Sequence, residues 1–233
     1  MDFSESVLEA KNDGVVCSLV LSEDASLVAC GTSTGSLSIL DLSNNDYRTI
    51  LRSHTANVSQ IVYHPYSNLM ISLSNDLTIR LWDPERLEQT YEFSYPNTDV
   101  CTCISGHPSA LLFAAGFKSG ILRIFDIENT CLVEEINHHS NPIMHIDYSP
   151  DGHFLAVLEE KFNMLYSPLH SHQPVKHLPV EIPSKYKYSC FSDNSEQIAL
   201  IGDSGTHINI WELRSLQMVG KIFTGKVIKK LKY

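Results

Sequence analysis

The chain has 233 residues, 43% of them hydrophobic, and its 17 basic and 27 acidic side chains give a formal net charge of −10. This length can bury a sizeable core as one large all-β domain or two small ones. No run of about 18 apolar residues is present, so no transmembrane helix is expected. The first residues, MDFSESVLEAKNDG, lack the basic and apolar regions of a signal peptide.

The negative charge is unevenly distributed. Five basic side chains and no acidic one lie in the last 13 residues, which leaves 12 basic against 27 acidic before them, a net charge of −15. So acidic a surface repels other polyanions at long range, and neither nucleic acid nor a membrane is expected as a partner. The basic end is interpreted as solvated, with contact to an acidic partner as the alternative.

Six cysteines, at positions 17, 30, 101, 103, 131 and 190, are scattered along the chain. Most lie in apolar strand-like runs such as VVCSLV and LVACG, where a thiol behaves as a small buried hydrophobe. Without a secretion signal, all six are expected to be reduced and the protein to be cytoplasmic.

A repeat of about 43 residues organises the chain. Two sequence positions, called anchors here, recur with nearly constant spacing over five units, which chance does not explain. The first anchor recurs at intervals of 42 or 43 residues, at Ser22, His64, His107, Ser149 and Ser192. The second is the third residue of ILDL, LWDP, IFDI, LYSP and IWEL, at intervals of 41 to 45 residues.

Within each unit apolar residues alternate with period two, which predicts strands and no helix. Four-stranded units at this period predict an all-β fold made of propeller blades. In the second unit the strands are expected at 58–64, 69–74, 77–83 and 87–93. The five blades are expected at approximately 14–50, 54–95, 98–137, 141–180 and 184–223.

Both ends of the repeat fall within a blade. Residues 6–10 read as the outer strand of a preceding blade, and 227–233 as the first strand of a sixth. Five blades plus part of a sixth form an incomplete propeller, which leaves a sheet edge and an apolar face uncovered. The chain is therefore expected to be a segment of a larger protein, with a closed five-bladed ring as the alternative.

The stretch SLSNDLTIRLWD, residues 72–83, resembles the blade signature of WD-repeat proteins, and His54 stands where that family places its loop histidine. The resemblance implies a buried tetrad of His54, Ser72, Asp76 and Trp82, in which Asp accepts from His, His from Ser, and Ser from the indole N–H. The other units carry Leu40, Phe125, Tyr166 and Trp211 at the tryptophan position, and Thr34, Ser119, Glu160 and Gly205 at the aspartate position. Those units are expected to depend on apolar packing instead.

Two serine motifs are weighed as catalytic sites. GTSTG, residues 31–35, matches the G-x-S-x-G nucleophile elbow, and GDSG, residues 202–205, resembles a serine-peptidase motif. Both fall on predicted hairpins in register with the other units, and no helix follows. Ser33 and Ser204 are therefore interpreted as turn residues, a hydrolase stays only as a minor alternative, and no enzyme is expected.

Histidines and carboxylates offer no stronger site. Zinc sites carry four ligands in close pairs, and no cysteine pair completes the histidines here. Cys101 and Cys103 have the spacing of strand residues that pack in a core. The histidines at 138, 139, 170, 172 and 177 are interpreted as exposed, and Glu134, Glu135, Glu159 and Glu160 as solvated. No metal or cofactor is expected.

A closer resemblance covers Gly31 to Glu135. Its most specific motifs are RSHT (52–55), LEQTYEF (87–93), and GFKSG (116–120) followed by LVEE and His138. They are similar to large centriolar WD-repeat proteins, which have an N-terminal microtubule-binding domain before tandem propellers; unit four departs from the pattern at Ser167. The resemblance implies a structural role in the centriole, basal body or cilium, with other scaffold proteins as partners.

It also implies that microtubule association belongs to a domain absent from this chain, and the charge agrees, because the acidic tails of tubulin would be repelled. The alternative is a generic WD-repeat adaptor in ubiquitin ligation, trafficking or RNA processing. Partner contacts are expected among exposed basic residues, namely Arg52, Arg86, Lys118, Lys226, Lys229 and Lys230.

Overall fold

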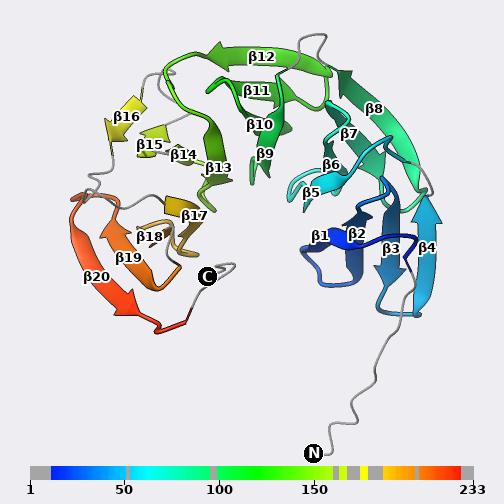
Figure 1. Ribbon diagram of the computed structural model, residues 1–233, viewed down its shortest axis with the longest axis horizontal. Coiled ribbons are helices and arrows are strands. Elements are labelled where there is room, and N and C mark those ends of the chain that lie inside the picture. Colours follow the sequence, from blue (N-terminus) through cyan, green and yellow to red (C-terminus); the bar gives the residue numbers. More distant parts are fainter. Residues whose placement is uncertain are drawn as a thin grey trace, which may run out of the picture. The chain divides into compact units, whose positions relative to one another are not determined.

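A computed structural model of the chain describes residues 12–50, 53–94, 99–159, 163–166, 174–177, 186–202 and 205–226. All regular secondary structure in these ranges is β-strand (Figure 1). The strands form five four-stranded antiparallel sheets, and in each one every strand pairs with its neighbours along the chain. The chain divides into two compact units, of which the first holds two sheets and the second holds three.

The first unit contains the first and second sheets. The first sheet consists of β1 (Val16–Leu21), β2 (Leu27–Thr32), β3 (Leu37–Asp41) and β4 (Asp46–Ile50). The second consists of β5 (Val58–Tyr63), β6 (Met70–Ser74), β7 (Thr78–Asp83) and β8 (Glu88–Ser94).

The second unit contains the other three sheets. The third consists of β9 (Cys101–Gly106), β10 (Leu112–Phe117), β11 (Leu122–Asp126) and β12 (Cys131–Ile136). The fourth consists of β13 (Ile143–Tyr148), β14 (Leu155–Glu159), β15 (Asn163–Tyr166) and β16 (Pro174–His177). The fifth consists of β17 (Tyr186–Phe191), β18 (Gln197–Gly202), β19 (His207–Glu212) and β20 (Met218–Phe223).

The first repeat anchor closes the turn between the first two strands of each sheet. Where the anchor is serine, its hydroxyl accepts the N–H of the residue five positions on, at 2.9 Å from Ser22 and Ser149 and 3.0 Å from Ser192. Where it is histidine, its Nδ1 accepts a backbone N–H at 3.2 Å, in His64 and in His107. The repeat is therefore visible in sequence because each sheet needs the same side-chain acceptor at this turn.

The second anchor shapes the hairpin between the third and fourth strands. Asp41, Asp83 and Asp126 each accept a backbone N–H two or three residues on, at 2.8–2.9 Å. Four positions after the anchor the chain takes a positive φ, at Asn45, Leu87, Thr130 and Leu216. The anchor and the left-handed residue together reverse the chain over a short distance.

Every first strand contains a β-bulge one residue after its start. The register with the second strand shifts there, at Cys17, Ser59, Thr102, Met144 and Lys187. A bulge inserts an extra residue and reverses the alternation of faces. Cys17 is exposed at this bulge, so the burial expected from the VVCSLV run is wrong for this residue. Cys131 is also exposed, and none of the six cysteines forms a disulfide.

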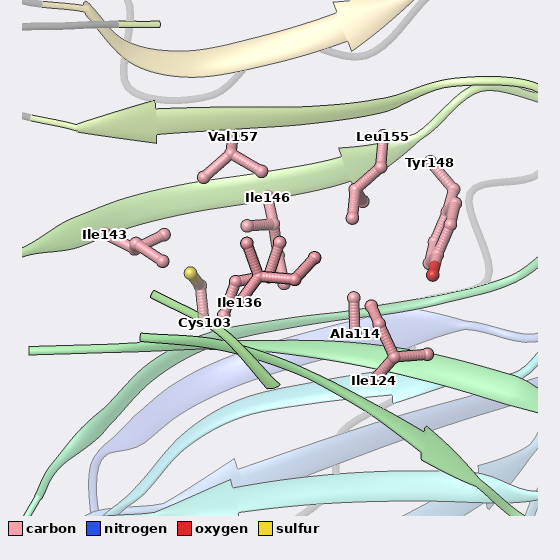
Figure 2. Close-up of a cluster of buried hydrophobic side chains, with 10 residues drawn as sticks. Cys103, Ala114, Ile124, Ile136, Ile143, Ile146, Tyr148, Leu155 and Val157 are labelled. Carbon is pink, nitrogen blue, oxygen red and sulfur yellow. The ribbon is translucent and has the colours of Figure 1, made fainter. Parts of the chain in front are cut away.

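Neighbouring sheets within a unit pack face to face. In the second unit, Ala114 and Ile124 of the third sheet form one buried cluster with Ile143 and Ile146 of the fourth (Figure 2). Ile143 fits closely because Gly116 lacks a side chain, and a Cβ there would lie 2.5 Å from Ile143 Cγ2.

The same arrangement recurs in the first unit, where a Cβ on Gly31 would lie 2.5 Å from Val58 Cγ1. The predicted all-β fold of four-stranded blades is confirmed by these sheets. The predicted strands at 6–10 and 227–233 lie outside the described residues.

Candidate functional site

The residues predicted as a tetrad meet in the interior of the second sheet. His54 precedes β5, Ser72 lies in β6, Asp76 in the β6–β7 hairpin, and Trp82 in β7. His54 Nδ1 is 2.9 Å from Asp76 Oδ2, and His54 Nε2 is 2.6 Å from Ser72 Oγ. Trp82 Nε1 donates to Ser72 Oγ at 2.8 Å. His54 and Ser72 are 1% and 0% exposed, so the cluster holds strands together out of contact with solvent.

The protonation states of the pair follow from its surroundings. Burial lowers the pKa of His54 although the neighbouring Asp76 carboxylate opposes that change. Burial opposes ionisation of Asp76, but hydrogen bonds from Thr78 and from the Thr55 N–H outweigh it and lower its pKa to about 2. A neutral His54 therefore donates from Nδ1 to an ionised Asp76 and accepts from Ser72 at Nε2.

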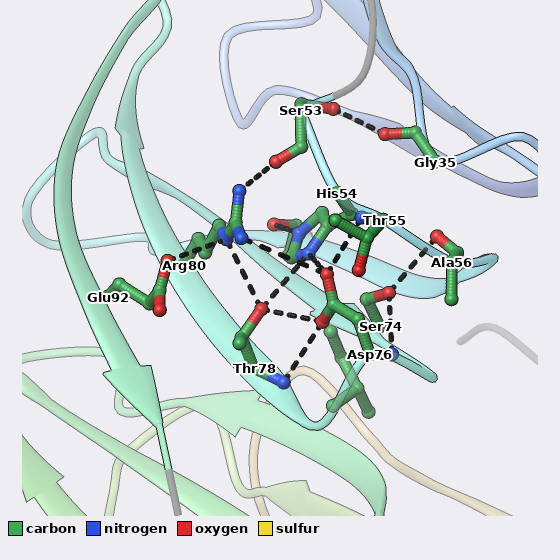
Figure 3. A network of polar contacts seen from close by, with 12 residues as sticks. Gly35, Ser53, His54, Thr55, Ala56, Ser74, Asp76, Thr78, Arg80 and Glu92 are labelled. Carbon is green, nitrogen blue, oxygen red and sulfur yellow. Dashed lines mark hydrogen bonds and ion pairs between the residues drawn. The ribbon is translucent and has the colours of Figure 1, made fainter.

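The cluster extends toward the outer strand through Arg80 (Figure 3). Thr78 Oγ1 donates to Asp76 Oδ1 at 2.6 Å. Arg80 lies 3.1 Å from Glu92 in β8 and 3.8 Å from Asp76, and it also donates to the carbonyl of Ser53. The sequence signature did not predict Arg80 or Glu92, which connect the tetrad to β8.

The third sheet carries an equivalent cluster with donor and acceptor exchanged. Asp99, in the connection that leads into β9, accepts from Ser119 N at 3.1 Å and Ser119 Oγ at 2.7 Å. Arg123 and Glu135 occupy the register positions of Arg80 and Glu92, and they are 2.9 Å apart. The carboxylate thus comes from the incoming connection and the donor from the hairpin.

The first sheet follows the same exchanged pattern. Asp13 precedes β1 and accepts from Thr34 Oγ1 at 2.8 Å and from Ser36 Oγ at 2.6 Å. Its neighbour Asn12 accepts from Ser38 Oγ at 2.9 Å and from Tyr47 at 2.8 Å. The expectation that the first and third blades depend on apolar packing instead of a polar cluster is therefore wrong, because Thr34 and Ser119 act as donors where aspartate was sought.

The fourth sheet holds a buried histidine–carboxylate pair in which His139, like His54, lies four residues before the first strand, whereas the carboxylate has another position. His139 Nδ1 lies 2.5 Å from Glu159 Oε1, and Asn141 donates its N–H and its side-chain amide to Glu159 Oε2, each at 3.2 Å. His139 is 7% and Glu159 1% exposed, so the interpretation of these two residues as solvated is wrong. Glu159 pairs with Ile143 as Ser74 pairs with Val58, so the carboxylate sits in the strand and not in the hairpin.

The fifth sheet has the tryptophan without its acceptor. Trp211 takes the register position of Trp82, but Leu200 stands where Ser72 does. The Trp211 indole N–H is buried and has no acceptor among the described residues. Asn209 instead donates to the Tyr186 hydroxyl at 2.5 Å.

The two serine motifs differ in what can be described. Ser33 lies in the β2–β3 hairpin, where its Oγ accepts the Val15 N–H at 3.2 Å and its N–H donates to the Val15 carbonyl at 2.8 Å. These contacts are those of a turn residue. Ser204 lies outside the described residues.

The metal-ligand candidates lie mostly outside the described ranges. His170, His172 and Glu160 are among the residues not described, and the His177 side chain is also not described. Among the residues that are described, no three His, Cys, Asp or Glu side chains cluster as a metal site would require. Within the same ranges, no helix is long and apolar enough to cross a membrane.

The predicted contact residues fall at different ends of their sheets. Arg86 lies in the β7–β8 hairpin, 76% exposed and 3.7 Å from Asp83. Lys118 is exposed in the β10–β11 hairpin, and Lys226 is exposed after β20. In a four-stranded meander these two kinds of hairpin lie at opposite ends, so Arg86 and Lys118 do not occupy corresponding surfaces. Arg52, Lys229 and Lys230 lie outside the described residues.

Repeated antiparallel four-stranded sheets, of which the first three carry a polar cluster at the hairpin between the second and third strands, are typical of the blades of WD-repeat proteins. The WD domain, G-beta repeat family matches residues 45–83 and 130–157. The chain belongs to the WD-repeat proteins.

Its relatives include far longer proteins. WD repeat-containing protein 90 of Xenopus tropicalis is 32% identical over 222 residues, 93% of this chain and 12% of that protein. The mouse (Mus musculus) protein of the same name is 36% identical over 155 residues, 66% of this chain and 8% of that protein. Centriole proteome protein 16 of Chlamydomonas reinhardtii is 37% identical over 153 residues, 65% of this chain and 7% of that protein.

Proposed function

We propose that this chain is a non-catalytic protein-interaction scaffold and a structural component of the centriole or basal body that is needed for cilium assembly. The similarity to centriole proteome protein 16 over 65% of the chain carries this proposal. The similarity to WD repeat-containing protein 90 over 93% of the chain supports the same assignment. The corresponding location is the cytoskeleton of the cytoplasm.

The buried clusters support a scaffold over an enzyme. Catalytic acid–base pairs must reach a substrate. His54 is 1% exposed and Glu159 is 1% exposed, and each is hydrogen-bonded inside its own sheet. Side chains that elsewhere serve in proton transfer are here committed to holding strands together.

The charge distribution supports protein partners other than tubulin. A net charge of −15 over the first 220 residues, from 12 basic and 27 acidic side chains, disfavours contact with acidic tubulin tails. We therefore assign microtubule association to a domain outside this chain and propose other scaffold proteins as its partners. Arg86, Lys118 and Lys226 are the described candidates for those contacts, and Arg52, Lys229 and Lys230 complete the set.

Localisation of the full-length protein in ciliated cells tests the proposal. The tagged protein is expected at centrioles and basal bodies. His54→Ala deprives the buried Asp76 and Ser72 of their partner, at a cost of about 1–3 kcal/mol, and is expected to reduce the fraction of ciliated cells. His153→Ala changes an exposed histidine of the β13–β14 turn and serves as the matched control.

Two results would contradict it. The tag could be found away from centrioles, which favours a WD-repeat adaptor in another complex. Alternatively, cells whose protein lacks residues 12–226 could form cilia at the normal frequency.

A further inference from the structure

Strand β20 carries exposed apolar side chains at the outer edge of the fifth sheet. Among the described strands it pairs with β19 alone, as the last strand of its sheet (Figure 1). Val219 is 54% and Phe223 is 74% exposed, and no other large apolar side chain in the described ranges is more exposed than Phe223. The outer edge of such a strand also presents backbone N–H and C=O groups to a further strand.

Phe223 does not lie on a face left uncovered by a missing sheet. It pairs with His207, and the alternation along β19 places it on the same face as Asn209 and Trp211. These two side chains are 0% and 5% exposed, and Trp211 belongs to one buried cluster with Leu165 of the fourth sheet. The fourth sheet therefore already covers this face, and Phe223 lies outside the covered part.

The charge beside Phe223 is positive. Lys221 lies on the same face, with its Nζ 5.6 Å from the centroid of the Phe223 ring. The position of Lys221 is held by Glu92 in the second sheet and by Glu135 in the third. Strand β20 has no acidic residue, whereas β8 and β12 have two each. An acidic strand would therefore meet a favourable charge at β20 and an unfavourable one at β8 and β12.

A second copy of the chain fits this edge poorly. Two β20 strands paired edge to edge would bring like charges together, because Lys221 is the one charged residue of each. The carboxylates of Glu92 and Glu135 could oppose Lys221. They are already paired within their own sheets, at 3.1 Å from Arg80 and 2.9 Å from Arg123. A strand from another protein meets neither cost.

We propose that β20 binds an extended acidic segment of another protein, which adds a strand to the fifth sheet and places an acidic side chain against Lys221 and an apolar one against Phe223. Backbone hydrogen bonds hold the added strand, and the two side chains select it. The two matching residues of the partner are two positions apart, because side chains on one face of a strand alternate. This partner class rests on the proposed scaffold function and makes it specific.

Peptide binding to the chain tests this. The probe is a fluorescently labelled peptide of sequence TVTETVT, and its binding is measured by anisotropy at low ionic strength, where exposed charges are least screened. The sequence is the same in both directions, so glutamate meets Lys221 and valine meets Phe223 whichever way the peptide pairs. The matched control is TVTKTVT, which has lysine in place of glutamate.

The chain is expected to bind the glutamate peptide about fivefold more tightly than the lysine peptide. Lys221→Glu is expected to reverse this preference. Phe223→Ser places there the residue type of Ser94, its counterpart in β8, and is expected to weaken both peptides alike. Lys187→Glu makes the same charge change at the exposed start of β17, on the other edge of the sheet, and is expected to leave the preference unchanged. Circular dichroism checks that each variant is folded.

Hydrogen exchange distinguishes strand addition from attachment through charge alone. Saturation with the glutamate peptide is expected to slow exchange of the backbone amides of β20 and to leave those of β12 unchanged.

Four results would overturn the proposal. The chain could bind both peptides equally, or bind neither up to about 1 mM. The amides of β20 could exchange at the same rate in the saturated complex. Self-association that grows with concentration and is lost in Lys221→Glu would make a second copy the occupant. Localisation in cells is measured separately, so each of these results leaves the centriolar assignment standing.

Discussion

Trp82 and Trp211 occupy equivalent register positions with opposite hydrogen-bond outcomes. Trp82 donates to Ser72 at 2.8 Å, whereas the buried indole N–H of Trp211 has no acceptor among the described residues. Both side chains are buried, at 3% and 5% exposure, so replacing either by phenylalanine removes a similar volume. The pair therefore separates the contribution of the hydrogen bond from that of packing.

Trp82→Phe is expected to lower the free energy of unfolding by about 1–2 kcal/mol more than Trp211→Phe. The first change leaves the Ser72 hydroxyl without a donor, and the second removes a donor that was unsatisfied. Urea denaturation followed by circular dichroism measures both. Equal losses would mean that the Trp82–Ser72 hydrogen bond contributes nothing beyond packing.

The polar clusters show how far single residues could be predicted from the sequence. The signature located His54, Ser72, Asp76 and Trp82, and the structure brings all four together. It missed Asp13 and Asp99, because exchanging donor and acceptor keeps the hydrogen bonds but changes the residue type at both positions. Glu159 was missed for another reason: its carboxylate lies in a strand, where the repeat places no charged residue.

At the scale of the strand and hairpin, the described sheets repeatedly place a residue with positive φ after the third strand. Leu87 and Leu216 reach φ of 57° and 54° while also packing against core clusters. Thr130 has a φ of 50° and no such compensation, and a β-branched residue is poorly suited to that region.

Thr130→Gly is expected to raise the free energy of unfolding by about 1 kcal/mol, since relief of backbone strain exceeds the entropy cost of glycine. Thr130→Ala keeps a Cβ in the same backbone conformation and is the control, with little gain expected. Thermal unfolding of both variants measures the difference. A glycine variant no more stable than the alanine one would show that the hairpin is unstrained.

Period-two patterning predicted the strands but could not locate the bulges. A bulge adds one residue without changing the residue types around it, so VVCSLV reads as an uninterrupted strand. The shift after Val16 turns Cys17 outward, opposite to the alternation that was assumed. Faces assigned from alternation alone are therefore reliable only beyond the bulge.

For the whole molecule, buried histidines set the response to acid. Burial lowers the pKa values of His54, His64 and His107. The unfolded chain therefore binds more protons than the folded one below the ordinary histidine pKa of about 6.5. Stability is expected to fall as pH drops from about 6.5 to 5, and His64→Asn to make that fall shallower. Urea denaturation at a series of pH values measures the slope.

Asp147 supplies a control of opposite sign. Burial raises its pKa to about 7. The folded chain then keeps a proton that the unfolded chain releases above about pH 4, so this residue reduces stability as pH rises toward 7. Asp147→Asn is expected to raise the free energy of unfolding at pH 7.5 and to leave it unchanged near pH 5. In the Asp147→Asn variant, which lacks this opposing contribution, stability that does not change between pH 7 and 5 would contradict the assignment of neutral buried histidines.

The repeat predicted the number of sheets and their order because its anchors are the turn acceptors that every sheet needs. It did not predict which apolar faces would be covered. Val16 and Leu19 have the same residue character as Val58 and Ile61, and only the structure shows that one pair is exposed and the other buried. Coverage depends on a neighbouring blade, which local pattern does not report.

The exchanged cluster of the first sheet also matters for anyone expressing parts of this protein. Because Asn12 and Asp13 hydrogen-bond to β3, to Tyr47 of β4 and to the β2–β3 hairpin, the working boundary of that sheet lies before its first strand. A cloning boundary placed at Val16 by secondary structure alone would keep every strand and lose the acceptors that join them. Domain limits in degenerate repeats are better drawn at the incoming polar connection than at the strand.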